Sequence, residues 1–314
     1  MKKLYLKGLL FCSIILSAIA VFLWLSVWEP TRLPIARWAG SEDFMSENEM
    51  LPYFERAGEA DGTTVLIIGD SIANQLFSDL QELNPQASIL ATNATLLITG
   101  QYLLAEEYLK SHPDATDVFL LIHPVALTRG FDARWGYRNA VMTYVETGTV
   151  GNLDKNTRTL LSDVYGPLFL KRGTVSLIEA SPVCRKLCLS YLEVNREAYV
   201  PEPPFELADQ YVRKLYDLCR ENRVELHVYS CPVSEYFRDQ VTELSGEYGG
   251  TWMSAQFPDY FAGMMFYPAE WAADSSHFSG EHAGRGQLNE IIRQAYGQTG
   301  LEGLNLESRE ISGK

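Results

Sequence analysis

Three residues of this chain have the types and settings that nucleophilic acyl chemistry requires. Ser71 follows the apolar run Val65–Ile68 and the pair Gly69-Asp70, at the point where a helical pattern begins. A serine hydroxyl is a poor nucleophile unless a base takes its proton. His277 is the best candidate for that base, because Asp274 lies three residues before it and can orient its imidazole.

Each of these residues also has a plainer interpretation. Ser71 alone could be a helix N-cap, and Asp274 with His277 could be an acid at a helix start beside a surface histidine. Their joint occurrence favours catalysis, because Ser71 ends the first core strand and Asp274-Ser-Ser-His277 stands just before the last helix.

The other four histidines have different expected positions. His112 ends a surface helix and is expected in solvent, and His227 lies inside a strand and is expected to be structural. His282 has no nearby acid suited to orient it. His123 closes the third strand, so it could line the site.

The elements that must position these residues alternate between strands and helices. Apolar runs predict strands at 65–68, 88–91, 117–124 and 224–230, and periodic segments predict helices at 72–83, 99–112, 205–223, 234–249 and 280–297. Uninterrupted apolar runs are typical of strands buried on both faces of a parallel sheet. In such a sheet, ligands gather at the carboxyl ends of the strands, where Ser71 is expected.

The pattern divides the chain into four parts. Residues 1–28 form a cytoplasmic N-terminus and membrane anchor, 29–62 a stalk, 63–297 the α/β domain and 298–314 a loose tail. Within the domain the rhythm breaks at about 125–205. That stretch is too long for one crossover and predicts an inserted, mostly helical cap over the mouth of the site.

The N-terminal segment predicts a single-pass membrane protein. Three lysines, Lys2, Lys3 and Lys7, precede an uncharged apolar run over 8–28 that is long enough to cross a bilayer. The lysines predict a cytoplasmic N-terminus and an extracytoplasmic catalytic domain. A cleaved signal peptide is the alternative, with a small-residue site at 18–20, but the apolar run continues through 21–25.

Charge and cysteine content exclude several classes of partner. Residues 1–28 hold three of the 26 basic residues and none of the 40 acidic ones, so the rest carries 23 basic and 40 acidic residues, a formal charge of −17. Such a surface is not expected to bind nucleic acid. No metal or cofactor is expected, since the spacing of the cysteines beyond the anchor has no metal signature. Disulfide pairing stays open among Cys184, Cys188, Cys219 and Cys231.

Two sequence blocks carry a resemblance to a known family. Gly69-Asp70-Ser71 after the first strand and Asp274-x-x-His277 before the last helix resemble the SGNH/GDSL hydrolase superfamily over about residues 62–296. The resemblance implies a three-layer α/β/α fold of the flavodoxin-like kind with a parallel sheet. It also implies Ser71 as nucleophile, His277 as base and Asp274 as its orienter, with Asp70 lining the site. The Gly69-x-Ser71-x-Ala73 pattern of an α/β-hydrolase elbow is set aside, because that elbow follows several strands.

The expected oxyanion hole departs from the family pattern. The family adds a glycine N–H from a second block and an asparagine from a third. Gly100 is the best match for the glycine, and Asn93, after the second strand, competes for the role. The third strand ends in His123-Pro124 where the asparagine is expected, so no asparagine is carried over there. A missing donor costs about 10²–10³ in rate.

The anchor and the late Cys231-Pro-Val turn are similar to a membrane-anchored branch of this family. That branch includes the D-alanyl transfer protein of teichoic acid modification and the alginate acetylation proteins. The similarity implies a serine esterase or O-acyltransferase that acts on acyl groups of a cell-envelope polysaccharide or polymer, with a membrane-bound acyltransferase as a candidate partner. The alternatives are a catalytically inactive scaffold or binding protein of an envelope-modification complex, and a lipase or thioesterase.

Overall fold

The fold is built around a parallel sheet. The structure is a computed structural model of the 314-residue chain and describes residues 2–45, 48–132, 135–282, 284–297, 299 and 301. The four strands stand in the order β2-β1-β3-β4, and every neighbouring pair is parallel. They are β1 (Val65–Gly69), β2 (Ala87–Ile89), β3 (Asp117–Ile122) and β4 (Glu225–Ser230). Their carboxyl ends therefore lie along one edge of the sheet.

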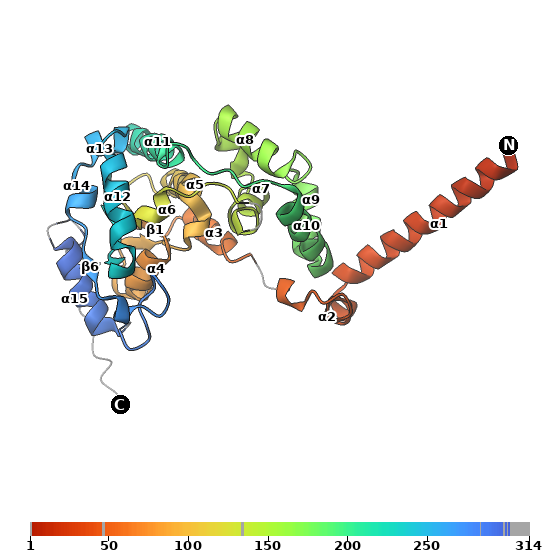
Figure 1. The fold of residues 1–314 in the computed structure, drawn as a ribbon, viewed down its shortest axis with the longest axis horizontal. Coiled ribbons are helices and arrows are strands. Elements are labelled where there is room, and N and C mark those ends of the chain that lie inside the picture. Colours follow the sequence, from red (N-terminus) through yellow and green to blue (C-terminus); the bar gives the residue numbers. More distant parts are fainter. Residues whose placement is uncertain are drawn as a thin grey trace.

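Both faces of this sheet are covered by helices. In β1, Leu66 and Ile68 join one hydrophobic cluster and Ile67 joins the other, as the alternation of side chains along a strand requires. The first cluster includes side chains of α3 (Leu51–Gly58), α5 (Leu97–Ser111) and α11 (Glu206–Asn222). The second includes side chains of α4 (Ser71–Phe77) and α15 (Arg285–Tyr296). The chain is thus an α/β protein with a buried parallel sheet (Figure 1).

Several elements differ from the sequence expectation. The helix expected at 72–83 ends at Phe77 and continues as a 3-10 turn, η2 (Ser78–Leu83). A second, two-stranded sheet pairs β5 (Val233–Ser234) with β6 (Phe266–Tyr267), and both strands are too short to leave a hydrophobic pattern. Short helices and 3-10 turns follow β5: η6 (Glu235–Phe237), α12 (Arg238–Tyr248), α13 (Trp252–Gln256), α14 (Asp259–Ala262) and η7 (Ala269–Trp271).

The N-terminal helix stands out from the body of the molecule. Helix α1 (Lys2–Val27) contains the stretch Leu4–Val27, which by length and composition is able to cross a membrane. The expected stalk contains α2 (Glu29–Trp38), η1 (Glu42–Phe44) and α3. Helix α3 packs on α5 and buries Phe54 and Ala57, so this part of the expected stalk belongs to the core around the sheet.

The expected insertion at 125–205 is a set of short helices between α1 and the sheet. It comprises α6 (Pro124–Leu127), a π-helical turn η4 (Tyr137–Val141), α7 (Met142–Glu146), η5 (Thr149–Asn152), α8 (Lys155–Tyr165), α9 (Arg172–Ala180) and α10 (Pro182–Asn195). Tyr144 of α7 hydrogen-bonds Leu96 O and the Thr99 hydroxyl, next to and inside α5. At the other end, α10 packs beside α2, where α1 leaves the body (Figure 1).

Two further expectations concern the cysteines and the tail. All five cysteines are free thiols in the structure, with Cys184, Cys219 and Cys231 buried. Most of the tail expected at 298–314 lies outside the described residues. Of its described residues, Leu301 is fully buried, so the chain still packs on the domain at that point.

Candidate active site

The turn between β1 and α4 fixes the position of Ser71, the first residue of that helix. The end of β1 lies so close to β3 that a Cβ atom at Gly69 would lie 2.2 Å from the carbonyl oxygen of Leu121. Only glycine fits this close approach without displacing backbone. The Gly69-Asp70-Ser71 sequence is therefore needed first for packing, and it leaves Ser71 at the carboxyl edge of the sheet.

Ser71, His277 and Asp274 form a continuous hydrogen-bonded relay. The Nε2 atom of His277 lies 2.7 Å from the Ser71 hydroxyl oxygen, across 206 residues of sequence. Its Nδ1 atom lies 2.7 Å from Oδ2 of Asp274. The structure thus brings together the three residues that the sequence suggested as a triad. With Nδ1–H donated to the carboxylate, Nε2 is free to accept the serine proton.

An Asx turn that begins at Asp274 fixes the position of His277. Oδ1 of Asp274 accepts hydrogen bonds from the N–H groups of Ser276 at 2.7 Å and His277 at 2.8 Å. The N–H of Ala273 closes the turn on the carbonyl of His277 at 2.7 Å. The Tyr267 hydroxyl donates to the carbonyl of Ser276. One carboxylate therefore both shapes the turn and orients the imidazole, and no helical turn is needed.

These contacts keep Asp274 ionised. Slight burial raises the pKa of this carboxyl, but the N–H groups of His277 and Ser276 and the His277 ring together hold its pKa well below the ordinary value. Its side chain is 58% exposed and that of His277 is 40% exposed. The relay therefore stands at an open surface that a large substrate can reach.

Gln75 fastens the histidine segment to the serine helix. Its side chain donates to the carbonyl of Phe278 and accepts from the N–H of Phe278, both at 2.8 Å. Gln75 lies one turn after Ser71 on α4, and Phe278 directly follows His277. These two hydrogen bonds fix the segment that carries His277 to the helix that carries Ser71. No sequence pattern singles out this glutamine.

Asp70 ties the carboxyl ends of three strands together. Its buried Oδ1 accepts from the N–H groups of Ile72 at 3.0 Å and Ala73 at 3.3 Å, and the Cys231 thiol lies 3.5 Å away. Oδ2 accepts from the N–H of His123 at 2.6 Å. The carboxylate thus occupies two N–H groups at the start of α4, and its contacts hold the ends of these strands together.

His123 lies buried at the end of β3. Its Nδ1 accepts from the N–H of Val125 at 3.3 Å, so the neutral ring carries its proton on Nε2. This Nε2 is buried and has no hydrogen-bond partner among the described residues. Burial lowers the pKa of His123, and Arg129 and His277 lower it further against the opposing effect of Asp70. His123 is therefore a neutral histidine with an unused donor near His277.

The two remaining oxyanion candidates have other contacts. Asn93 caps the 3-10 turn η3 (Ala94–Leu96) and accepts from the N–H of Thr95 at 3.0 Å. Gly100 lies inside α5, where a Cβ atom would come within 2.6 Å of the Tyr144 hydroxyl. The side chain of Leu96, 2.5 Å from such a Cβ, and the hydroxyl of Tyr144 together explain this glycine, and nothing in these contacts directs its N–H to Ser71.

A strained residue opens α5 at the carboxyl side of β2. Leu97 has φ +62° and ψ 167°, a backbone region that is essentially restricted to glycine. Such strain persists only where its surroundings hold it, and it occurs at functional sites. Leu97 stands three residues before Gly100. A leucine gives no sequence signal for this strain.

The other histidines have contacts outside the relay. His112 is buried, 2.9 Å from Asp61 and stacked on Tyr108, so the expectation of a solvated side chain was wrong. His282 stacks on Trp271. His227 lies within β4, as expected, where it pairs with Phe119 of β3, and its Nε2 is 2.8 Å from Oδ1 of Asp117.

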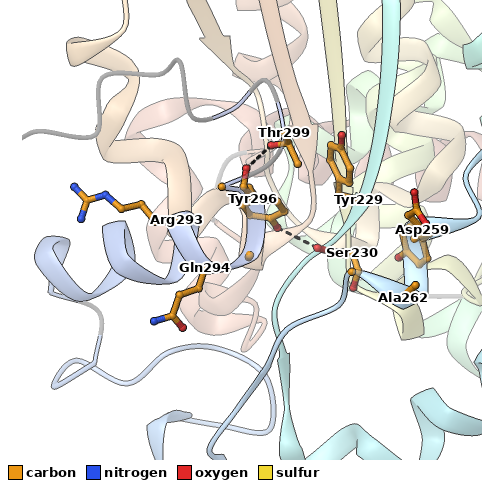
Figure 2. Close-up of a pocket in the computed structure, with 12 residues that line it drawn as sticks. Tyr229, Ser230, Asp259, Ala262, Arg293, Gln294, Tyr296 and Thr299 are labelled. Atoms are coloured by element: carbon orange, nitrogen blue, oxygen red, sulfur yellow. Dashed lines mark hydrogen bonds between the residues drawn. The ribbon is translucent and has the colours of Figure 1, made fainter.

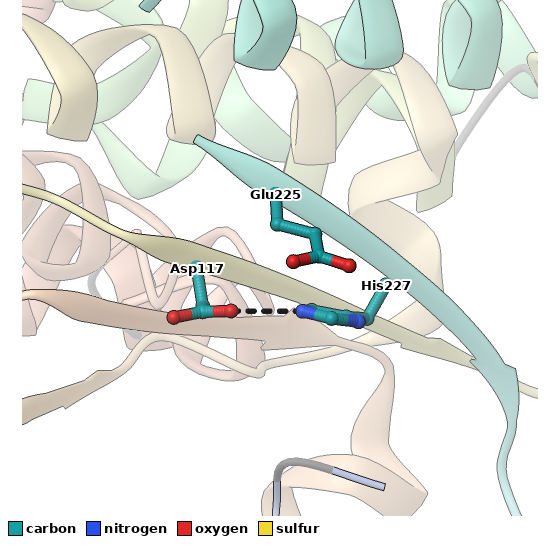
Figure 3. Close-up of side chains that lie close together, drawn as sticks. All are labelled: Asp117, Glu225 and His227. Atoms are coloured by element: carbon teal, nitrogen blue, oxygen red, sulfur yellow. Dashed lines mark hydrogen bonds and ion pairs between the residues drawn. The ribbon is translucent and has the colours of Figure 1, made fainter. Parts of the chain in front are cut away.

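Among the described residues, one cluster of side chains has the composition of a metal site. It consists of Asp117, Glu225 and His227. Their ligand atoms lie within 4.8 Å of one another (Figure 3). The hydrogen bond between the ring and Asp117 accounts for this arrangement without an ion.

A cavity of about 710 Å³ opens between β4 and α15. It is lined by Tyr229, Ser230, Asp259 and Arg293 among others, and the Tyr296 hydroxyl bonds the carbonyl of Ser230 at 3.1 Å (Figure 2). None of the three relay residues lines it, so its volume says nothing about the substrate of Ser71.

Comparison of the chain with protein-family models, with curated proteins and with solved structures gave no match. The chemistry of the site is therefore read from its own geometry. The relay at the carboxyl edge of a parallel sheet is the feature that any functional interpretation has to explain.

Proposed function

We propose that this protein is a membrane-anchored serine esterase or O-acyltransferase of the SGNH type. The observation that carries the proposal is the relay in which Asp274, His277 and Ser71 are joined by two consecutive hydrogen bonds of 2.7 Å. An N-cap serine and a surface histidine, the plainer interpretations, have no reason to meet across 206 residues. The parallel sheet with helices on both faces is compatible with the three-layer SGNH fold.

In the proposed reaction, the Ser71 oxygen attacks an acyl carbonyl while His277 Nε2 takes the serine proton. The tetrahedral intermediate collapses, the ester C–O bond breaks, and the leaving alkoxide receives that proton from His277. The acyl group is then held on Ser71 as an ester. An incoming hydroxyl gives its proton to His277, attacks the ester and releases Ser71 with its proton restored.

The proposed oxyanion hole uses donors other than the missing asparagine. The buried Nε2–H of His123 has no partner among the described residues, which leaves it able to donate to a developing oxyanion. The N–H of Ser71 is the second candidate, because Asp70 already occupies the next two N–H groups of the helix. His123 would thus take the role of the third-block asparagine.

The proposed substrate is an acylated polysaccharide or another polymer of the cell envelope. Helix α1 would hold the site at the extracytoplasmic face of the membrane, near membrane-bound acyl donors and a membrane-bound acyltransferase partner. The exposed relay suits a polymer better than a small buried ligand. A tether raises the local concentration of a polymer acceptor, on which transfer depends, whereas hydrolysis uses water that is present everywhere.

The nucleophile is tested with a fluorophosphonate probe on the full chain in detergent. Wild-type protein should be labelled, and Ser71→Ala should abolish labelling. Ser78→Ala, an exposed serine just beyond α4, is the matched control and should label like wild type. Folded wild-type protein that does not react would favour the inactive scaffold over the enzyme.

Transfer and hydrolysis are separated by their products. An activated acyl ester is supplied with and without glycan acceptors, and acylated glycan is measured against free acid. We expect Ser71-dependent acylated glycan to exceed free acid. Free acid as the sole product across a broad acceptor panel would identify an esterase instead.

A further inference from the structure

The insertion is joined to the membrane end of the chain by direct contacts. The Ser26 hydroxyl, near the end of α1, lies 2.7 Å from the hydroxyl of Ser181, which caps α10, and both are buried. Lys186 of α10 donates to the carbonyls of Ala39 at 3.0 Å and Gly40 at 2.7 Å, just beyond α2. Helix α10 is thus held at the point where α1 ends.

Tryptophans mark this end of α1 as a membrane–water boundary. Trp24 and Trp28 stack at 5.1 Å, and Trp38 packs edge-on against Phe22 at 6.1 Å. The exposure of the three tryptophans runs from 47% to 80%. Tryptophan is enriched where a helix leaves the hydrocarbon core. Because Ser181 touches the same end of α1, the start of α10 lies at that depth.

Exposed apolar side chains are concentrated on the insertion. Among the described residues beyond Trp38, eight large apolar side chains are exposed, and Tyr236 alone lies outside 125–205. Leu187, Tyr191 and Val194 share one face of α10, at spacings of four and three residues. The name membrane face is used for the exposed apolar side chains of α9, of α10 and of the loop before them. These are Leu168, Leu177, Leu187, Tyr191 and Val194.

The charge of the insertion is opposite to that of the rest of the domain. Residues 125–205 contain ten basic and eight acidic residues, a formal charge of +2. The other residues beyond 28 contain 13 basic and 32 acidic ones, a formal charge of −19. The exposed residues Lys171 and Arg172 stand at the start of α9, three and four residues after Leu168. Basic residues next to an apolar face suit an anionic phospholipid surface.

We propose that the membrane face rests on the lipid bilayer that α1 crosses, with its apolar side chains at the headgroup–acyl boundary. This rests on the membrane insertion of α1 in the proposed function. Figure 1 agrees, because α9 and α10 stand at the end of the body from which α1 departs and the helix with Ser71 stands farther away. The insertion then sets the height and orientation of the relay above the membrane.

The test uses full-length protein in vesicles of phosphatidylglycerol and phosphatidylcholine whose acyl chains are brominated. The fluorescent residue dansylalanine replaces Val194, Leu187, Tyr236 or Leu9 in turn, and bromine quenches it on contact. We expect quenching at Leu9, Leu187 and Val194 and none at Tyr236. Vesicles contain no other protein, so quenching reports lipid itself.

Two outcomes overturn the inference in distinguishable ways. Quenching at Leu9 with none at Leu187 or Val194 means that α1 is inserted and the membrane face is not on lipid. No quenching at Leu9 means that α1 is not in the bilayer, and the anchor of the proposed function fails with it.

A charge reversal tests the role of the basic pair. Lys171→Glu with Arg172→Glu should weaken quenching at Val194. Lys155→Glu with Arg158→Glu makes the same charge change on exposed residues of α8 and should leave it unaltered. If both double variants weaken quenching equally, Lys171 and Arg172 make no specific contribution to the contact between the membrane face and the lipid.

Discussion

Gln75 holds the segment that carries His277 against the helix that carries Ser71. Its side chain makes two hydrogen bonds of 2.8 Å to the backbone of Phe278, next to His277. Gln75→Ala removes both and leaves the Asx turn itself intact. At about 0.5–1.5 kcal/mol for each hydrogen bond, the two contribute ~1–3 kcal/mol to the placement of His277.

That free energy appears as reactivity, because only the placed imidazole meets Ser71. With tenfold for every ~1.4 kcal/mol, Gln75→Ala should slow fluorophosphonate labelling by about 5- to 140-fold. Gln75→Glu keeps an acceptor for the Phe278 N–H and loses the donor to its carbonyl, so its rate should fall in between. Asn74→Ala, the preceding position on α4, is the matched control.

Rates are compared at urea concentrations at which circular dichroism shows every variant fully folded. Unfolding then cannot account for a slower reaction. Labelling of Gln75→Ala at the wild-type rate would refute the reasoning, because it would mean that the Asx turn holds His277 without help from α4. A loss of similar size in Asn74→Ala would also refute it.

Three further predictions concern the same region. Asp274→Asn should slow labelling by about 10²–10⁴-fold, because an amide stabilises the wrong imidazole tautomer, while Asp114→Asn, a surface change, should have no effect. The pKa of His123 is lowered from 6.5, so the unfolded chain binds a proton that the folded chain does not, and the free energy of unfolding should decrease as pH falls through that value. His123→Asn should flatten this decrease in urea titrations at different pH, and an unchanged slope would contradict it. Gly69→Ala should cost at least about 1–3 kcal/mol in urea unfolding, whereas Gly246→Ala, with open space around its Cβ, should be neutral or stabilising.

The predictable part of the fold came from uninterrupted apolar runs and from two short blocks. The run at 65–68 is a buried strand because both faces of the sheet are covered, and that requirement is visible in sequence. The meeting of Ser71 with His277 could be suggested because each lies next to an element with a clear pattern.

The features that could not be predicted from the sequence depend on contacts between residues that carry no local sequence signal. Gln75 is one polar residue on a helix, and only the fold shows that Phe278 lies opposite it. His112 was expected in solvent, but its Nε2 is hydrogen-bonded to the carboxylate of Asp61, which is distant in sequence. This partner allows the imidazole to be buried. Phe54 lies in a polar stretch that looks like a stalk, and α5 is what buries it.

The sequence separation within the relay has a consequence for the time at which reactivity begins. A chain is synthesised from its N-terminus, and Ser71 precedes His277 by 206 residues. At roughly 5–20 residues per second, a ribosome needs about 10–40 s to pass from one to the other. During that interval Ser71 has no histidine beside it, so the reactivity that we propose for this serine is absent. The distance along the chain therefore delays assembly of the relay until His277 has been synthesised.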